Sequence, residues 1–484
     1  MNWTLWLPLI VLSSSLVTGI VIFFLPEKRS GWRTFLNLAG AVIKVTAVFI
    51  MSWFILVHGH LYEIRFTLGL GFDFLLRVDF FSLVFLSLSS NLWLVTTVYA
   101  IGYLEGSPHR SRFFGFFSLC VTATTGIALA GNLITFFIFY EFLTLVTYPL
   151  VVHRGTEAAL RAGRTYLLYT ISGGMILFVA IVQIYVLAGP VDFSSDGFLS
   201  GTGEQYHALL RLVFVLLVLG FGVKAALFPL HAWLPVAMVA PAPVSALLHA
   251  VAVVKAGAYG ILRVVFYVYG KEFAHDLGLL APLAAVAAVT IIFGSVMALK
   301  QNDLKRRLAY STVSQISYIT LGAALLGPLA ALGGLVHLIH QGVMKITLFF
   351  CAGNIAECVG LHKISELNGI GRRMPLTMGA FTVAAFGMIG IPPVAGFVSK
   401  WFLCLGGLQT ERLWVVGLLV TSTLLNAAYF LPIIHAAWFR EPDGPWQTLR
   451  SGGRFEAPWT LLFPSLATGG FSLAAGVWAA WEWS

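Results

Sequence analysis

Lysines and histidines stand inside long apolar segments of this 484-residue sequence. The stretch from residue 222 to residue 257 reads GVKAALFPLHAWLPVAMVAPAPVSALLHAVAVVKAG, and it carries Lys224 and Lys255 with His231 and His249 between them. A charged side chain at the centre of a bilayer costs about 2.5 to 3.5 kcal/mol on insertion scales, so such residues usually face a bundle interior and have a function there. Amines and imidazoles can take up and release protons, which indicates proton-transfer chemistry.

One carboxylate accompanies these bases. Glu141, in NLITFFIFYEFLTLVTYPLV, is the only acidic residue that we expect deep in the membrane. Five of the 29 basic residues lie within apolar segments, namely Lys44, Lys224, Lys255, Lys345 and Lys400. A structural ion pair, or a lysine whose ammonium reaches the membrane surface, is the alternative interpretation of any one of them. Five lysines and one glutamate on six segments favour a proton-carrying set, because a lysine with a movable acidic partner can change its protonation state.

A third group lies in GLVHLIHQGVMKITLFFCAGN. His337, Gln341 and Lys345 are four residues apart and share one helix face, with His340 on the adjoining side. Neutral imidazole both donates and accepts a hydrogen bond, so this stripe favours a proton relay over simple packing. The accessory candidates for this relay are Gln341, His231 and His249.

The composition identifies the elements that must hold these residues. Hydrophobic residues make up 59% of the chain and charged residues 10%, against about 25% charged in a soluble domain. The sequence predicts an all-α polytopic membrane protein, without the short alternating segments of barrel strands. Fourteen apolar segments are expected, centred near residues 14, 45, 90, 121, 142, 176, 218, 256, 288, 318, 344, 391, 425 and 471.

Prolines interrupt two of these segments. Pro229 and Pro235 break the seventh, and Pro392 and Pro393 break the twelfth. The breaks are five segments apart, as expected if segments four to eight are repeated in nine to thirteen, and matched broken helices are typical of a transport site. The expected divisions are residues 1–105 for three N-terminal helices, 106–270 and 271–440 for the two repeats, and 441–484 for a cytoplasmic loop and the last helix.

The loop charges predict an orientation. Loops after odd-numbered segments hold eighteen Lys and Arg residues and the other loops hold six. Because basic loops stay on the cytoplasmic side, both termini are expected on the other side of a cell inner membrane.

Several signatures are missing from the sequence. Its four cysteines form no CxxC pair, and there is no GxGxxG, GxxxxGK[ST], HExxH or nucleophile elbow. The net charge of +9 is spread over short loops without an aromatic and basic surface for nucleic acid. We therefore expect no metal, cofactor, redox or hydrolytic centre in this chain.

Three stretches carry a family resemblance: VKAALFPLHAWLPVAMVAPAPVSALLHAVAVVKAGAYGILR, the glutamate of FFIFYEFLTLVTYPLV, and HLIHQGVMKITLFFCAG. They resemble the antiporter-like subunits shared by respiratory complex I, membrane-bound hydrogenases and Mrp-type sodium/proton antiporters. The resemblance covers essentially the whole chain and implies fourteen helices with two inverted five-helix repeats. It also implies site roles: an ion pair of Glu141 with Lys224, an eighth-helix lysine at Lys255, a central relay of His337, His340 and Lys345, and an exit group at Lys400.

Different features of the sequence resemble different subunit types of the family. A-type Mrp subunits and L-type complex I subunits extend well beyond the fourteenth helix, whereas this chain ends directly after it, at Ser484. M-type subunits typically carry glutamate in the twelfth helix, where this chain has Lys400 as D-type Mrp subunits do. The sequence SALLHAVAVVKAG of the expected eighth helix resembles A- and L-type subunits more than D-type subunits. Lys44 matches no family role, and it is expected either to be functional or to face lipid or reach the membrane surface.

The expected function is proton translocation in a multi-subunit membrane complex, with exchange of Na+ or K+ for protons as in Mrp antiporters. One alternative is a proton-pumping subunit of complex I (NADH-quinone oxidoreductase) or of a membrane-bound hydrogenase, with the redox cofactors in other subunits. Another is ion-coupled uptake of inorganic carbon. The expected partners are homologous antiporter-like subunits, small membrane subunits and the lipid bilayer.

Overall fold

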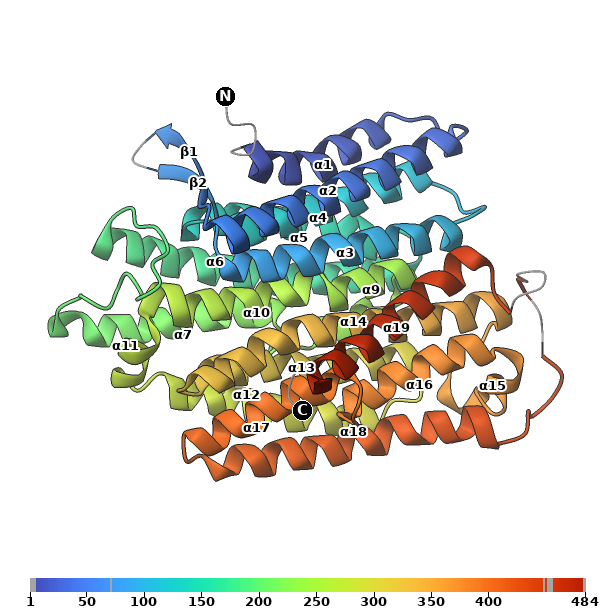
Figure 1. The fold of residues 1–484 in the computed structure, drawn as a ribbon. Helices are drawn as coiled ribbons and strands as arrows, with labels where there is room; N and C mark the ends of the chain where they lie inside the picture. The colour runs from blue at the N-terminus through green and yellow to red at the C-terminus, as the bar shows by residue number, and fades with distance from the viewer. Residues whose placement is uncertain (1–5, 70–71, 447–448, 451–455, 482–484) are drawn as a thin grey trace. The chain divides into compact units, whose positions relative to one another are not determined.

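The computed structural model describes residues 6–69, 72–446, 449–450 and 456–481 (Figure 1). The chain divides into two compact units. Unit 1 comprises Met1–Thr97, Gly106–Ala225 and Val251–Leu280. Unit 2 comprises Val98–Glu105, Ala226–Ala250 and Ala281–Ser484. The four-part division expected from the sequence remains a prediction.

Unit 1 is a helix bundle with one β-hairpin. Its elements are α1 (Leu7–Phe23), α2 (Ser30–His58), β1 (Tyr62–Gly69), β2 (Phe72–Val78), α3 (Phe80–Tyr103, to Thr97 in this unit), α4 (Arg110–Leu129), α5 (Leu133–Val151), α6 (Glu157–Ala188), the 3₁₀ turn η2 (Glu204–Tyr206), α7 (His207–Lys224), α10 (Val253–Arg263), the π-helical turn η4 (Val264–Tyr269) and α11 (Lys271–Asp276). Helix α4 packs against both α1 and α5, which explains why most of its side chains are buried. Helix α7 packs between α6 and α10.

The hairpin is an element that the sequence analysis did not predict. Strands β1 and β2 pair antiparallel, with Tyr62 opposite Val78 and Phe66 opposite Phe74. The expectation of no short alternating segment is wrong at this point, because Tyr62, Ile64 and Phe66 alternate with polar residues, as a half-buried strand requires.

Unit 2 is organised around one long helix. Its elements are α8 (Trp233–Val236), the 3₁₀ turn η3 (Ala237–Val239), α9 (Ala242–Ala250), α12 (Leu280–Leu299), α13 (Leu304–Ala324), α14 (Pro328–Val359), the 3₁₀ turn η5 (Ile364–Glu366), α15 (Ile370–Arg373), α16 (Pro375–Ile389), α17 (Ala395–Gln409), α18 (Leu413–Phe439) and α19 (Trp459–Trp481). Helices α9, α13, α16, α17 and α19 all pack on α14. The side chains of α14 that face these neighbours are therefore removed from lipid.

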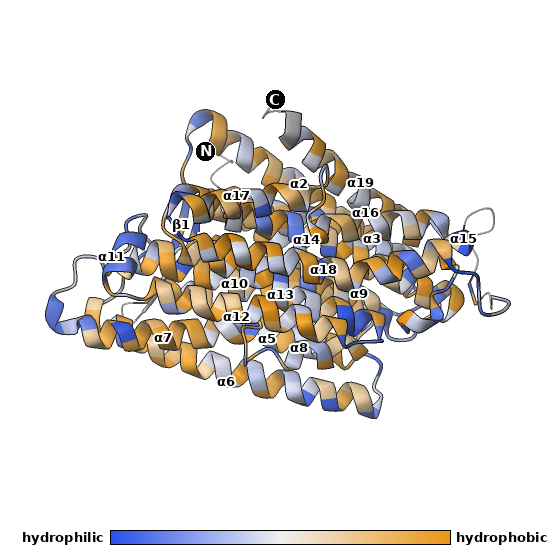
Figure 2. Cartoon of the chain, turned by 90° about the horizontal axis from the view of Figure 1, so that it is seen from below, coloured by the Kyte–Doolittle hydropathy of each residue, from blue (hydrophilic) through white to orange (hydrophobic). Residues whose placement is uncertain are grey.

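The chain is a multi-pass membrane protein, as expected. Within the described residues, 11 helices are long and apolar enough to cross a membrane, and α1 and α16 are shorter apolar helices. Figure 2 shows hydrophobic colour along helices such as α7, α10 and α12, and hydrophilic colour at α11, β1 and α15. Helices lie at every expected centre except residue 391, which falls between α16 and α17. The count of fourteen spans and the inverted repeats remain predictions.

Both expected helix breaks are present. Helix α7 ends at Lys224, and Pro229 follows it in a non-helical stretch. Helix α16 ends at Ile389, because Gly390 takes the left-handed conformation (φ 95°) that commonly terminates helices, and Pro392 and Pro393 then follow. Each break leaves helix-end carbonyls without their usual N–H partners, so side-chain donors can bind there.

Candidate functional site

Lys224 is the last residue of α7 and is fully buried. Its ammonium donates a hydrogen bond to the main-chain carbonyl of Tyr140 on α5, and it lies 3.4 Å from the centre of the Tyr140 ring. A carbonyl oxygen and an aromatic face both attract a cation, so Tyr140 holds the charge of Lys224. This position is directly beside Glu141, the next residue of α5.

Glu141 lies near Lys224 without pairing with it. The carboxylate packs against Gly174 of α6, where any larger side chain would collide with it. Its Oε1 atom has no hydrogen-bond partner among the described residues, although Lys224 is near enough to interact with it electrostatically. The structure therefore brings the two predicted partners together while Lys224 is bound to Tyr140.

Lys255 lies on α10 and is fully buried. Two residues later, Gly257 touches the backbone of Lys224 and Ala225 so closely that only a hydrogen atom fits there. Helix α10 therefore packs closely against the end of α7. Lys255, on α10, and Lys224, on α7, are both buried inside unit 1.

A second site surrounds Lys345 in unit 2. The Lys345 ammonium donates to the Ser311 hydroxyl at 2.7 Å and to the Leu308 carbonyl at 3.2 Å, both on α13. The Ser311 and Tyr429 hydroxyls are 2.8 Å apart, and Tyr429 donates to Oδ1 of Asn426 at 2.7 Å. If Ser311 donates to Tyr429, every donor in this series points away from Lys345, which is the direction in which a proton would leave it.

The same series reaches Lys400. Nδ2 of Asn426 donates to the Met388 carbonyl at 3.1 Å, and that carbonyl also accepts from Lys400 at 3.0 Å. Lys400 donates to the Ile389 carbonyl as well, at 2.7 Å. Met388 and Ile389 end α16, so the helix break itself builds the Lys400 site from free carbonyls at the negative end of a helix dipole.

His337 joins this site from α14. Its Nδ1 is 2.8 Å from the hydroxyl of Ser399, the residue before Lys400. Its ring stacks on Tyr318 with centroids 5.0 Å apart, and the Lys400 ammonium lies 5.5 Å from the centre of the same Tyr318 ring. The structure thus groups three predicted residues, His337, Lys345 and Lys400, around side chains of α13, α17 and α18.

The other predicted residues of unit 2 do not join the series by a described hydrogen bond. His340 is half-buried and interacts with the backbone of Ala395, and both polar atoms of the buried Gln341 side chain lack a partner among the described residues. His249 packs against Phe349 with ring centroids 4.7 Å apart, and its two ring nitrogens likewise have no partner among the described residues. His231 packs against Phe293 at 4.7 Å. The geometry of His231 and His249 is that of packed aromatic side chains.

The linking residues Ser311, Tyr429 and Asn426 were not predicted, because none of them carries a charge. One signal was available in the sequence. The α13 stretch STVSQISYIT is unusually polar for an apolar bundle, and its serines, threonines and glutamine are all buried. A polar stripe inside a bundle indicates that it faces other polar groups.

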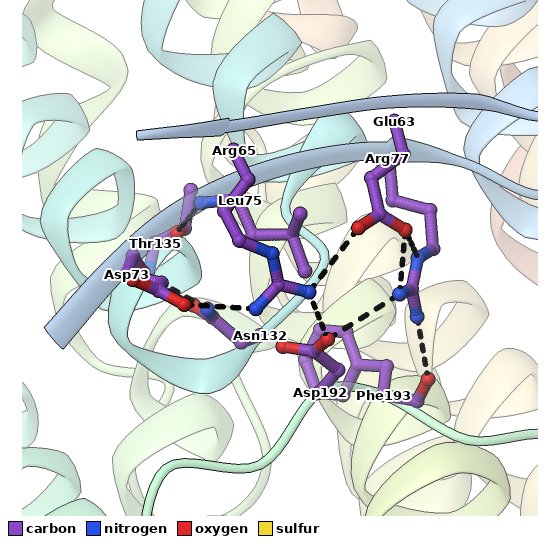
Figure 3. Close-up of polar contacts among 9 residues, drawn as sticks. All are labelled: Glu63, Arg65, Asp73, Leu75, Arg77, Asn132, Thr135, Asp192 and Phe193. Atoms are coloured by element: carbon purple, nitrogen blue, oxygen red, sulfur yellow. Dashed lines mark hydrogen bonds and ion pairs between the residues drawn. The ribbon is translucent and has the colours of Figure 1, made fainter. Parts of the chain in front are cut away.

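Figure 3 shows a further polar cluster, at the hairpin of unit 1. Arg65 pairs with Asp73 at 2.8 Å, Glu63 at 3.1 Å and Asp192 at 2.5 Å. Arg77 pairs with Glu63 at 2.7 Å and with Asp192 at 3.4 Å. Because Asp192 belongs to the loop after α6, the ion pairs fasten the hairpin to that loop.

The hairpin is also tied to the start of α5. The Asn132 side chain caps α5 by accepting from the Thr135 N–H at 2.8 Å, and it donates to the Asp73 carbonyl at 3.0 Å. The Thr135 hydroxyl accepts from the Leu75 N–H at 2.9 Å. The helix that carries Glu141 is therefore positioned at its first turn by β2.

Four free cysteines are present, at Cys120, Cys351, Cys358 and Cys404. Over the described ranges, no three His, Cys, Asp or Glu side chains are placed to hold a metal ion.

Comparison with known proteins identifies the family. The family described as NADH:quinone oxidoreductase/Mrp antiporter, TM, matches residues 130–426. The chain is 38% identical over 370 residues to the N-type subunit of the NADH-quinone oxidoreductase of Desulforudis audaxviator, covering 75% of this chain and 72% of the relative. It is 27% identical over 456 residues to the D-type subunit of the Na(+)/H(+) antiporter of Bacillus subtilis, covering 92% and 89% of the two chains.

The fold agrees with a solved structure. A chain in the structure of the Mrp complex from Dietzia sp. DQ12-45-1b superposes with a TM-score of 0.87 at 23% identity, covering 100% of this chain and 96% of that one. The resemblance noted in the sequence is confirmed. The chain belongs to the NADH:quinone oxidoreductase/Mrp antiporter family of transmembrane subunits.

Proposed function

We propose that this chain translocates protons as an antiporter-like subunit of a hetero-oligomeric membrane complex, and that the complex exchanges Na+ or K+ for protons. The observation that carries the proposal is the series from Lys345 through Ser311, Tyr429 and Asn426 to the carbonyl that binds Lys400. The relatives named as antiporter and quinone oxidoreductase subunits support the same class of function.

In unit 2 the proposed relay begins at Lys345. Its ammonium gives a proton to Ser311 as the Ser311 hydroxyl proton passes to Tyr429 and the Tyr429 hydroxyl proton passes on toward Lys400. The N–H bond of Lys345 breaks, and each hydroxyl gains one O–H bond as it loses another. A carboxamide does not readily carry a proton, so Asn426 positions Tyr429 and the Met388 carbonyl instead of relaying. The Tyr429 proton is released when Tyr429 turns from Asn426, and the N–H bond that Lys345 lost forms again at the unprotonated amine of Lys400 or at the neutral imidazole of His337 beside Ser399.

In unit 1 the proposed switch is Glu141 with Lys224. Lys224 holds its proton while it binds the Tyr140 carbonyl, and movement of Glu141 toward or away from it changes how strongly the ammonium is stabilised. Lys255 on the adjoining α10 is the proposed next carrier. We assign Glu141, Lys224 and Lys255 to the first expected repeat, 106–270, and the relay from Lys345 to Lys400 to the second, 271–440. Both termini lie on the non-cytoplasmic side in this proposal.

A proton-pumping subunit of an NADH-quinone oxidoreductase is the second candidate, because an N-type subunit of such an enzyme is 38% identical to this chain. The redox centres would then lie in other subunits, and the proton path would be the same.

The test uses the complete complex, purified with its neighbours and reconstituted into liposomes that hold a pH-sensitive dye. A Na+ or K+ gradient should drive proton movement if the complex is an antiporter. Proton movement that follows only electron transfer to a quinone would replace the first candidate by the second. A complex that moves protons under neither drive would overturn both.

A further inference from the structure

Lys44 of α2 is a buried lysine that the proposed relay does not use. Its side chain is fully buried, so the lipid-facing or surface-reaching position, one of the two alternatives for Lys44, is wrong. The ammonium donates to the Ser15 hydroxyl of α1 at 2.8 Å and to the Thr125 hydroxyl of α4 at 2.6 Å. It also lies 5.1 Å from the centre of the Trp93 ring. Helices α1 and α4 therefore close over Lys44 and exclude lipid from it.

The surroundings of Lys44 match those of the proposed transport lysines. Lys345 and Lys400 are likewise buried, donate to neutral oxygens and lie within 6.0 Å of an aromatic ring centre. None of these three lysines forms an ion pair with a carboxylate among the described residues. An ammonium that is held only by neutral groups has no fixed counter-charge. When it loses its proton, no carboxylate is left buried without a partner, so the neutral amine can form.

No other titratable side chain of the neighbouring helices competes for this pocket. Helix α1 and the first part of α3, to Thr97, carry no ionisable residue. Helices α2 and α4 otherwise carry only Arg33, His58, Arg110, Arg112 and Cys120. Cys120 faces Thr147 of α5, with the sulfur 3.4 Å from that hydroxyl. A change of protonation in the pocket would therefore occur at Lys44 itself.

Polar groups lead from Lys44 toward one end of unit 1. The Thr122 hydroxyl lies 2.8 Å from Ser15 and 3.0 Å from the Ser118 carbonyl, so it can donate to either. The Ser118 hydroxyl donates to Asn37 at 3.5 Å, and Asn37 donates to the Arg33 carbonyl at 3.0 Å.

The line ends at an exposed carboxylate. Arg33 donates to the Ser111 hydroxyl at 2.9 Å and pairs at 3.4 Å with Glu27, whose side chain is 48% exposed. Polar groups of α1, α2 and α4 thus lie between buried Lys44 and the molecular surface on one side. Asn37 and Arg33 position this series and do not relay, because a carboxamide and a guanidinium do not readily exchange a proton.

We propose that Lys44, in the hydroxyl pocket between α1, α2 and α4, is a further proton-exchanging lysine that is loaded from the Glu27 end of unit 1. In the unloading step an N–H bond of Lys44 breaks and an O–H bond forms at Ser15, the Ser15 proton passes to Thr122, and the Thr122 proton passes to a water molecule from the Glu27 end, which leaves as hydronium. Ser15 and Thr122 each lose one O–H bond as they gain another, and loading runs through the same steps in reverse. The amine that remains is neutral. Its use during transport rests on the proposed function, whereas the change of protonation does not.

The direct test is ¹⁵N magnetic resonance of the lysine side chains in the reconstituted complex. The Lys44 signal is identified by its loss in Lys44→Met. We expect it to move between the ammonium and amine positions across the pH range in which the complex is folded, also when Glu141→Gln has removed the proposed switch of unit 1. An ammonium signal that never changes would overturn the inference, whatever the transport assay shows.

The matched controls are two buried threonines of α4. Thr122→Val removes the hydrogen bond to Ser15 and leaves both oxygen partners of Lys44 in place, whereas Thr124 bonds only to the Cys120 carbonyl within the described part of the chain. Thr122→Val should slow the exchange of the Lys44 proton by about tenfold or more, and Thr124→Val should leave it unchanged. Equal behaviour of the two variants would contradict loading through Thr122.

The transport assay separates a proton carrier from a fixed charge. Lys44→Met and Lys44→Arg should both lower proton flux severalfold, because arginine stays protonated. If Lys44→Arg transports like the wild type, the inference is overturned. If Lys44→Met does not assemble, the Lys44 signal is identified by its loss in Lys44→Arg, and the magnetic resonance comparison of Thr122→Val with Thr124→Val decides.

Discussion

Lys400 is bound by the last two carbonyls of α16, and these can hold any cation that reaches them. Arginine keeps the charge and stays protonated in proteins. We therefore expect Lys400→Arg to block proton movement in reconstituted complexes as completely as Lys400→Met, with normal assembly. Wild-type flux in Lys400→Arg would mean that Lys400 is a fixed charge and that the proton leaves elsewhere.

Tyr429 is the hydroxyl that links Ser311 to Asn426. Tyr429→Phe removes this link and keeps the ring, so flux should fall by about tenfold or more while stability falls by only about 1 kcal/mol. Tyr318→Phe is the matched control, since the Tyr318 hydroxyl contacts Ser422 and Gln315, which are outside the series from Lys345 to Lys400, and its ring stays against His337. Equal loss in both variants would show that packing, and not the relay hydroxyl, limits transport.

At the scale of elements, the ion pairs of Arg65 and Arg77 stabilise the hairpin only while the carboxylates of Glu63 and Asp73 are ionised. Burial raises the pKa of Glu63, but hydrogen bonds from Arg77 and Arg65 outweigh it and lower that pKa overall. The hydrogen bond from Arg65 lowers the pKa of Asp73. Because both folded-state pKa values lie below the unfolded values near 4, the stabilisation is complete above about pH 4 and disappears as the pH falls through the folded-state values.

Hydrogen exchange of the β1 amides, corrected for the intrinsic rate, measures this dependence. Protection should be constant from neutral pH down to about pH 4 and should fall below it. Asp73→Asn should start with lower protection and lose less on acidification, because one titrating partner of Arg65 is gone. Wild-type protection that persists at about pH 2 would show that the ion pairs do not hold the hairpin.

Residues that stand out in an apolar segment, such as charged residues and prolines, could be predicted from the sequence, whereas neutral polar residues and a short strand pair could not. Lys224, Lys345 and Lys400 could be assigned to buried positions because a charge in an apolar run is costly and easily seen. The proline breaks could be predicted for the same local reason. The hairpin was missed because its alternation covers few residues beside long helices. Ser311, Tyr429 and Asn426 were missed because neutral polar side chains show their role only when α13 and α18 pack together.

At the scale of the whole molecule, the chain presents large apolar surfaces. Leu168, Met175 and Val186 of α6 are 68%, 66% and 78% exposed, and Leu413 and Leu424 of α18 are 70% and 66% exposed. Such surfaces contact lipid or neighbouring membrane subunits. Since the chain is expected to work beside homologous subunits, the purified chain alone should give little or no cation-coupled proton movement in liposomes, while the complete complex does. Robust exchange by the chain alone would contradict the need for partners.

The central claim is that protons pass through the buried lysines, and Lys345→Met tests it most directly. The measurement is cation-driven proton flux in liposomes that contain equal amounts of assembled wild-type or variant complex. The methionine side chain has similar length and no transferable proton, so flux should fall to the level of liposomes without protein. Wild-type flux through an assembled Lys345→Met complex would contradict the proposed relay.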